Sequence, residues 1–299
     1  MDKNSTIGMI GIGLMGHGIA RNVAKHYPLV VLDHPGNQPL DELQAAGARI
    51  VACARDVAAA ADVVILCVTG TPQVEAVLLG EGGVLEGLKP GAVVIDCSTA
   101  VPSSTDKVAQ AVQAAGGRFL DAPMTRTPKE AHEGRLNLLV GGDKALFDEC
   151  RSLLATFAEN ITHCGAVGAG HRMKLLHNYV SLGSITLLAE AAACAERSGV
   201  APDVFVDVLA KGGGGGAALE RLRPYITARD TSGIRFSISN AHKDLGYYTT
   251  MAEEIGAARL VASATLATLA NGLAASTQQA LLPEMVSLLA NAQAPKKPN

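Results

Sequence analysis

Short apolar runs alternate with longer helical patterns through the first half of the chain. Four runs are rich in β-branched residues and carry few polar ones, as buried strands do. These predicted strands are Thr6–Ile10, Leu29–Asp33, Val63–Val68 and Ala92–Asp96. Helical patterns lie between or after them, at His17–His26, Pro72–Leu79 and Ser103–Ala115. The alternation predicts a doubly wound parallel sheet.

Two more apolar runs, Phe119–Pro123 and Leu136–Val140, are expected to extend the sheet, and Lys144–Phe157 is expected to be a helix. The pattern then changes. Residues 170–198 form one helical stretch that is apolar on nearly every face, and the rest of the chain has helical patterns as well. A helix that is apolar all round is typically buried, so we expect this one to be buried.

We therefore predict an α/β fold in which a sheet domain, residues 1–165, is followed by an all-helical domain, residues 166–292. The long helix links the two domains. The glycine run Gly212–Gly216 is expected to be a loop inside the helical domain, and residues 293–299 are expected to be a disordered tail.

Composition agrees with two globular domains that carry no nucleic-acid surface. The 299 residues are 48% hydrophobic and 3% aromatic, with no Trp, which suits helices packed closely on a parallel sheet. The net charge is −3, and no basic block occurs beyond Lys296–Lys297. Phosphate backbones require clustered Lys and Arg, so a nucleic-acid partner is not expected.

Cysteine and histidine spacing predicts no metal site. The six cysteines never reach a CxxC spacing, and the eight histidines show no ligand spacing with carboxylates. Free thiols favour a reducing, cytoplasmic location. The first residues lack the basic flank and long apolar core of a signal peptide. No run reaches the roughly 18 apolar residues of a membrane span, so no membrane partner is expected.

A glycine motif follows the first predicted strand and opens the first predicted helix. The first glycine permits a tight turn, the second lets backbone N–H groups approach a pyrophosphate, and the third allows close helix–strand packing. We interpret the motif as a Rossmann-type dinucleotide site, and a purely structural glycine turn is the alternative. Its residues are Gly11, Ile12, Gly13, Leu14, Met15 and Gly16.

Asp33 ends the second predicted strand, 20 residues after Gly13. A carboxylate there accepts both ribose hydroxyls of NAD and repels the 2′-phosphate of NADP. The next residues, His34-Pro35-Gly36, offer no arginine to hold that phosphate. NAD is therefore the predicted cofactor, and NADP is the less favoured one.

Lys174 and Asn178 lie four positions apart in the long helical stretch and therefore share a face. A lysine between Met173 and Leu175 is costly to desolvate, and burial lowers the pKa of a lysine toward that of a usable acid and base. From these residues alone, the alternative is a lysine that extends from the helix start to water.

Five segments, taken in order, resemble motifs of the β-hydroxyacid dehydrogenase family, which includes 3-hydroxyisobutyrate dehydrogenase and tartronate semialdehyde reductase. They are Gly8–Gly16, Asp96–Thr99, Asp121–Pro123, Gly165–Asn178 and His242–Leu245. The similarity covers essentially the whole chain. It implies an NAD-binding Rossmann domain followed by a helical domain for substrate binding and oligomerisation.

The resemblance also implies how the residues share the chemistry. Lys174 gives a proton to the carbonyl oxygen during reduction or takes one from the hydroxyl during oxidation, and Asn178 holds the lysine and the substrate oxygen. Hydride passes between C4 of the nicotinamide and the substrate carbon. Further cofactor contacts are implied for Val68, Thr69, Gln73, Thr99 and Lys243.

The substrate loop departs from the family's usual Asp-Ala-Pro-Val-Ser-Gly-Gly. Here Met124 is followed by Thr125, Arg126 and Thr127. A guanidinium grips an oxyanion with two parallel hydrogen bonds. The Arg-Thr pair resembles sulfolactaldehyde reductase, a family member that handles a sulfonate. We therefore predict that these residues bind a substrate with a strong or second anionic group, and a surface arginine is the alternative.

His177 precedes Asn178 where the family commonly has a second asparagine. It is a candidate donor to an extra anionic group of the substrate, or it packs against the neighbouring domain, and the sequence leaves both roles open. Gly212–Gly216 likewise either admits a larger substrate or allows domain closure.

The sequence thus predicts an NAD-dependent oxidoreductase that acts on a small 3-hydroxy acid or semialdehyde. The substrate is expected to carry a strong or second anionic group, as sulfolactaldehyde does. One alternative is an ordinary 3-hydroxyisobutyrate dehydrogenase or tartronate semialdehyde reductase. Another, from a different class, is a non-catalytic NAD-binding sensor. The resemblance also implies a homodimer or homotetramer.

Overall fold

The computed structural model describes residues 2, 4–277 and 279–292. The tail predicted at 293–299 lies outside the described residues. The chain divides into two compact units, Met1–Lys174 and Leu175–Asn299.

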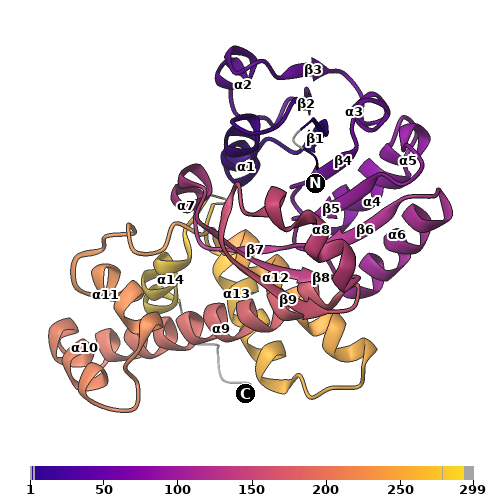
Figure 1. Ribbon diagram of the computed structural model, residues 1–299. Helices are drawn as coiled ribbons and strands as arrows, with labels where there is room; N and C mark the ends of the chain where they lie inside the picture. Colours follow the sequence, from indigo (N-terminus) through magenta and orange to yellow (C-terminus); the bar gives the residue numbers. More distant parts are fainter. Residues whose placement is uncertain (1, 3, 278, 293–299) are drawn as a thin grey trace. The chain divides into compact units, whose positions relative to one another are not determined.

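The first unit is built on a nine-stranded sheet in the order β3-β2-β1-β4-β5-β6-β8-β7, with β9 paired to β8 (Figure 1). The strands are β1 (Ile7–Ile10), β2 (Leu29–Leu32), β3 (Arg49–Val51), β4 (Val63–Leu66), β5 (Val93–Asp96), β6 (Arg118–Asp121), β7 (Met124–Thr125), β8 (Leu136–Gly141) and β9 (Ala158–Gly165). All pairings among strands β1 to β6 are parallel. The predicted doubly wound sheet is confirmed.

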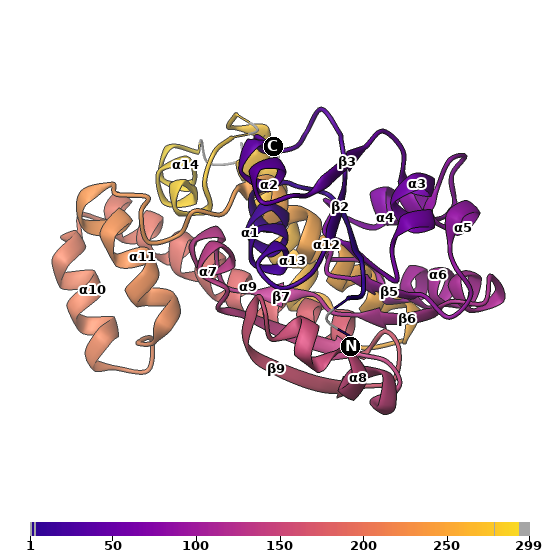
Figure 2. The same cartoon turned by 45° about the horizontal axis from the view of Figure 1, so that its top comes forward.

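Both faces of this sheet are covered by helices. The helices of the first unit are α1 (Leu14–Ala24), α2 (Asp41–Ala45), α3 (Ala54–Ala60), α4 (Thr71–Leu79), α5 (Val84–Gly87), α6 (Pro102–Ala114), α7 (Pro128–Glu133) and α8 (Lys144–Leu154). Successive strand residues point to opposite faces. Met9 and Ile65 join the core under α1 and α8, while Ile10 and Val64 join the core under α3, α4 and α6 (Figures 1 and 2).

The far end of the sheet differs from a simple parallel array. Leu136–Gly141 extends the sheet as predicted, but β8 runs antiparallel to β6. The apolar pattern does not reveal β9, because its sequence Ala-Glu-Asn-Ile-Thr-His-Cys-Gly is largely exposed and polar. Short runs such as β3 and α3 were also missed, since three to seven residues carry too little periodicity to recognise.

The second unit is helical. Helix α9 (Ala169–Arg197) begins in the first unit and continues into the second. The others are α10 (Pro202–Lys211), α11 (Ala217–Ala228), α12 (Ile238–Glu254), α13 (Leu260–Ala274), the short 3₁₀ helix η1 (Leu282–Glu284) and α14 (Met285–Asn291). Gly212–Gly216 connects α10 to α11, inside this unit as predicted. No helix among the described residues is long and apolar enough to cross a bilayer.

The expectation that α9 is buried on every face is wrong. Leu182, Ile185 and Ala189 pack into the core of the second unit. Val180 and Leu187, however, are 65% and 70% exposed. The core of the second unit covers only one face of this segment, so the apolar side chains on another face are exposed.

Gly18 sets the close contact between α1 and α7. A Cβ there would lie 2.6 Å from the carbonyl carbon of Ala131 and 2.7 Å from the amide nitrogen of His132. These are backbone atoms and cannot move aside as a flexible side chain would. Gly18→Ala is therefore expected to destabilise the protein by about 1–3 kcal/mol, because overpacking outweighs the roughly 1 kcal/mol gain in helix propensity.

Gly246→Ala is the matched control, since a Cβ at this position in α12 meets nothing within 4 Å. It should leave the melting temperature unchanged or raise it. Thermal unfolding of both variants checks the comparison, and a Gly18→Ala protein as stable as Gly246→Ala would contradict it.

Candidate active site

The glycine turn after β1 has the conformation that a dinucleotide site needs. Gly11 has φ +91°, and a Cβ there would lie 2.3 Å from the carbonyl oxygen of Cys67. A Cβ on Gly16 would lie 1.9 Å from the carbonyl oxygen of Gly11, so only glycine lets α1 begin this close to β1. By contrast, a Cβ on Gly13 meets nothing within 4 Å. The protein therefore leaves open space beside the first turn of α1, whose N–H groups point out of the helix end.

Asn37 holds this turn against the end of β2. The Ile12 N–H donates to Asn37 Oδ1 at 3.3 Å, and Asn37 Nδ2 donates to the Leu32 carbonyl at 2.9 Å. Asp33 is the first residue after β2. Its N–H donates to the Val51 carbonyl, and its side chain is exposed. Sequence reasoning missed Asn37, because a loop asparagine 25 residues from its partner leaves no local signal.

The turns after β4 and β5 are joined to each other. The Val68 N–H donates to Ser98 Oγ at 3.0 Å, and the Ser98 N–H donates to Asp96 Oδ1 at 2.9 Å. Thr69 and Thr99 follow in these two turns, and Gln73 lies exposed in the first turn of α4. Burial raises the pKa of the preceding Cys67 thiol to about 12, which keeps this sulfur unreactive near neutral pH.

These predicted cofactor residues lie at one edge of the sheet. Gly11 follows β1, Asp33 follows β2, Val68 and Thr69 follow β4, and Thr99 follows β5. These are the carboxyl ends of neighbouring parallel strands, and the strand order reverses between β1 and β4. Ligands of open α/β sheets bind at such a switch point.

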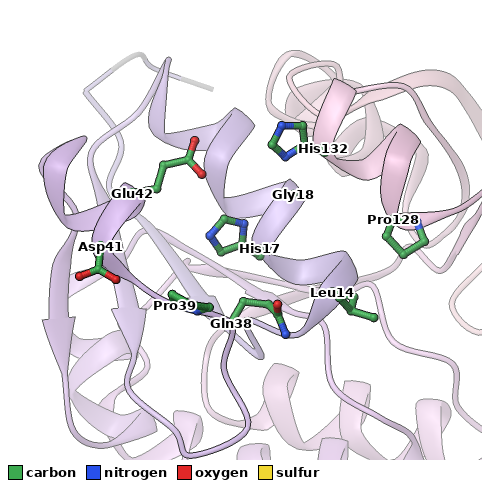
Figure 3. Close-up of a pocket in the computed structure, with 9 residues that line it drawn as sticks. All are labelled: Leu14, His17, Gly18, Gln38, Pro39, Asp41, Glu42, Pro128 and His132. Atoms are coloured by element: carbon green, nitrogen blue, oxygen red, sulfur yellow. The ribbon is translucent and has the colours of Figure 1, made fainter. Parts of the chain in front are cut away.

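A pocket of about 510 Å³ is lined by residues of α1, of the segment after β2, of α2 and of α7 (Figure 3). Figure 3 shows His17 of α1, Glu42 of α2 and His132 of α7 around it. Leu14 belongs to the glycine motif, and Gln38 and Pro39 follow β2, but none of the nine lining residues follows β4 or β5. The pocket therefore borders the part of the predicted cofactor edge after β1 and β2 and does not include the turns after β4 and β5.

Lys174 is held at the start of the substrate loop. Its Nζ donates to the Met124 carbonyl at 2.7 Å, and its side chain is half-buried. The helix that carries it is fixed by Asp121, whose buried carboxylate accepts the N–H groups of Gly168 at 2.7 Å and His171 at 2.8 Å. A carboxylate at a helix N-terminus is stabilised by the helix dipole.

Asn178 has a defined orientation within the second unit. Its Nδ2 donates to Asp244 Oδ2 at 2.7 Å, which turns its Oδ1 toward His177 Nδ1 at 3.0 Å. Because Oδ1 only accepts, Nδ1 of His177 must carry the hydrogen. Lys243 Nζ lies 3.3 Å from Asp244 Oδ1, so one buried carboxylate holds both Asn178 and Lys243.

The substrate-loop residues already have partners inside the protein. Thr125 Oγ1 accepts from Asn137 Nδ2 at 3.1 Å. The Arg126 guanidinium donates to Glu159 and to the Arg135 carbonyl, and hydrogen bonding to it lowers the pKa of the Glu159 carboxyl. Arg126 also has φ +82°, a left-handed conformation that is strained for a side chain of this size.

Thr127 has a local role as the N-cap of α7. Its hydroxyl accepts from the Lys129 N–H, and its own backbone N–H donates to Glu130 Oε2 at 3.0 Å in a capping box. Sequence reasoning also missed Glu159, which lies 33 residues from Arg126 and meets it only because β9 pairs with β8.

Among the described residues, no group of three or more His, Cys, Asp or Glu could hold a metal ion.

A parallel sheet whose glycine turn meets a helix end, with a lysine fixed beside a strand end, defines a dinucleotide-dependent oxidoreductase. Residues 6–165 match the model of the NAD-binding domain of 6-phosphogluconate dehydrogenase. Residues 168–289 match a second model, described as NAD-binding of NADP-dependent 3-hydroxyisobutyrate dehydrogenase. The chain belongs to the β-hydroxyacid dehydrogenase family.

Individual relatives agree with this assignment. The chain is 33% identical over 291 residues to 2-hydroxy-3-oxopropionate reductase of Escherichia coli, covering 95% of this chain and 98% of that protein. It is 34% identical over 247 residues to NAD-dependent L-serine dehydrogenase of Pseudomonas aeruginosa, covering 80% and 83%. The solved structure of Mycobacterium tuberculosis 3-hydroxyisobutyrate dehydrogenase with L-serine is similar with a TM-score of 0.84, at 26% identity over 96% and 99% of the chains.

Proposed function

We propose that this protein is an NAD-dependent oxidoreductase that transfers hydride between nicotinamide and a small 3-hydroxy acid or semialdehyde, with Lys174 as the acid and base. The observation that carries the proposal is the 2.7 Å bond from Lys174 Nζ to the Met124 carbonyl, at the start of the substrate loop. The named relatives that act on 2-hydroxy-3-oxopropionate and L-serine support the substrate class.

The residues of the first unit fit a dinucleotide. Gly11 and Gly16 allow a close turn, and the open space at Gly13 suits a pyrophosphate against the first turn of α1. The exposed carboxylate of Asp33 suits a ribose diol. When bound, the nicotinamide supplies or accepts the hydride. Thr69, Gln73 and Thr99 are proposed to orient it.

Lys174 is proposed to move the proton that balances hydride transfer. During reduction, its ammonium gives a proton to the carbonyl oxygen as the hydride reaches the carbon, so a hydroxyl forms and a neutral amine remains. The Met124 carbonyl accepts one hydrogen of the ammonium and so fixes the direction of Nζ. Asn178, turned by Asp244, is proposed to hold the substrate oxygen.

Arg126 supports a finer substrate assignment. We propose that its guanidinium, with Thr125, binds a second or strongly anionic group such as a sulfonate or a second carboxylate. Glu159 occupies that guanidinium in the structure, so a substrate anion would have to replace it. The same ion pair favours the second candidate, an ordinary 3-hydroxyisobutyrate or 2-hydroxy-3-oxopropionate enzyme in which Arg126 is structural.

Lys174→Ala is expected to lower kcat by about 10²–10⁴-fold with NADH affinity nearly unchanged, because general acid–base catalysis contributes that much. Lys144→Ala is the control, since Lys144 is an exposed lysine paired with Asp148 on α8. NADH oxidation with a panel of semialdehydes measures turnover, and fluorescence titration measures NADH binding. A Lys174→Ala enzyme as active as the control would contradict the assignment, and NADH binding without any turnover in the wild type would favour the sensor.

Asp33→Ala is expected to raise the ratio of NADP to NAD use by about tenfold or more, because it removes both the ribose acceptor and the repulsion of the 2′-phosphate. Asp41→Ala changes an exposed carboxylate at the start of α2 and should leave the ratio unchanged. Steady-state kcat/KM with each cofactor gives the comparison. An unaltered ratio in Asp33→Ala would remove this residue from the cofactor site.

Arg126→Gly and Glu159→Gln form a pair with opposite expected effects. Arg126→Gly should raise KM about tenfold or more for sulfonated or dicarboxylic substrates relative to monocarboxylic ones, since it removes the anion partner. Glu159→Gln removes the internal competitor and should lower the same relative KM. If both variants keep the wild-type preference, Arg126 is structural and the second candidate holds.

A further inference from the structure

A buried polar cluster lies where the cofactor edge of the sheet meets the first turn of α9. His171, Asp96 and Asp121 are each fully buried, and all three belong to the first unit. Polar groups this deep are costly unless they are hydrogen-bonded, so the contacts of the imidazole call for an explanation.

Both ring nitrogens of His171 have partners from other elements. Nε2 lies 3.1 Å from the Ser98 carbonyl after β5, and Nδ1 lies 2.8 Å from Thr105 Oγ1 on α6. A carbonyl only accepts, so Nε2 must donate. The imidazole therefore ties α9 to both β5 and α6.

Two buried carboxylates flank the same ring. Asp96 Oδ2 lies 3.9 Å from Nε2, and Asp121 Oδ2 lies 3.9 Å from Nδ1. Burial raises the pKa of Asp96, and the neighbouring His171 partly offsets this rise. Among the described residues, Asp96 Oδ2 has no hydrogen-bond partner. Two buried carboxylates thus lie beside the ring, in addition to its two hydrogen-bond partners.

Ser98 connects this buried cluster to the predicted cofactor-binding turns. Its N–H is held by Asp96, its carbonyl by His171, and its hydroxyl accepts the Val68 N–H. The turns that carry Thr69 and Thr99 are therefore fixed through Ser98. On the other side, Lys174 follows His171 by three residues on the same helix.

We infer that His171 is a positioning residue, whose Nε2–Ser98 bond sets Lys174 in place relative to the cofactor-binding turns after β4 and β5. The inference rests on the proposed function, because it assigns Lys174 and those turns their roles. His171 touches neither substrate nor cofactor in this account. It acts through the helix that it anchors.

Three substitutions separate this role from simple core filling. His171→Leu keeps bulk and removes both bonds. His171→Gln extends an amide that can donate near the position of Nε2, whereas His171→Asn places its amide nearer Nδ1 and Thr105. Thr105→Val removes the partner on the other side of the ring and serves as the matched control.

Turnover is measured per NADH-binding site, counted by fluorescence titration, so that loss of folded protein does not lower the value. His171→Leu is expected to reduce kcat per site by about 10–100-fold, since displacements near 1 Å cost that much. His171→Gln should recover to within about threefold of wild type, and Thr105→Val should stay within threefold, while His171→Asn should not recover. The inference would be overturned if kcat per site in His171→Leu stayed within twofold of wild type. It would also be overturned if His171→Gln did not recover kcat.

Hydrogen exchange keeps the test independent of activity. In His171→Leu, the amides of Val68 and Ser98 and those of the first turn of α9 should exchange faster together, and His171→Gln should restore protection. A wild type that turns over no substrate would reject the proposed function. The exchange pattern would still show whether His171 connects the turns after β4 and β5 to the start of α9. Unchanged exchange in His171→Leu, or faster exchange confined to one segment, would reject the link itself. If His171→Leu does not fold, the Gln and Asn variants decide the same question.

Discussion

The buried carboxylate of Asp121 is the constraint on which the rest of the site depends. It ends β6 and accepts two N–H groups from the start of α9, at Gly168 and His171. These bonds satisfy two N–H groups at the start of the helix and so fix where it begins. Lys174 then follows within one turn and reaches the Met124 carbonyl. The sheet edge and the helix that carries Lys174 are thus joined by one side chain.

Much of this arrangement could be predicted from the sequence, because it depends on local backbone requirements. The glycine turn needs a positive φ at Gly11 and close packing at Gly16, so those residue types mark it directly. Apolar runs of β-branched residues likewise marked β1, β2, β4 and β5 to within one or two residues. What could not be predicted is long-range pairing. Glu159 meets Arg126, and Asn37 meets Ile12, through strand order and loop path rather than through any local pattern.

Long-range pairing also determines the surroundings of Arg126, the residue proposed to select the substrate. The sequence marks Arg126 as unusual for its loop, but its charge balance depends on β9, whose polar pattern hides the strand. Arg126 is consequently a guanidinium with an internal carboxylate partner in a strained left-handed conformation. In the second unit, Asp244 similarly turns Asn178 and pairs with Lys243, which links two motifs that are 66 residues apart. In both units, carboxylates therefore hold the side chains that the sequence predicts to be functional.

We propose that the carboxyl edge of β1, β2, β4 and β5 binds the dinucleotide and that Lys174 exchanges a proton with the reacting oxygen beside Met124. A crystal structure with NADH and a non-reacting 3-hydroxy acid analogue tests both parts of this proposal. We expect the pyrophosphate to lie against the N–H groups that follow Gly13, the ribose diol to bind Asp33, and Lys174 Nζ to lie within hydrogen-bond distance of the analogue's oxygen. A dinucleotide in the pocket lined by His17 and His132, or an analogue bound away from Lys174, would contradict it.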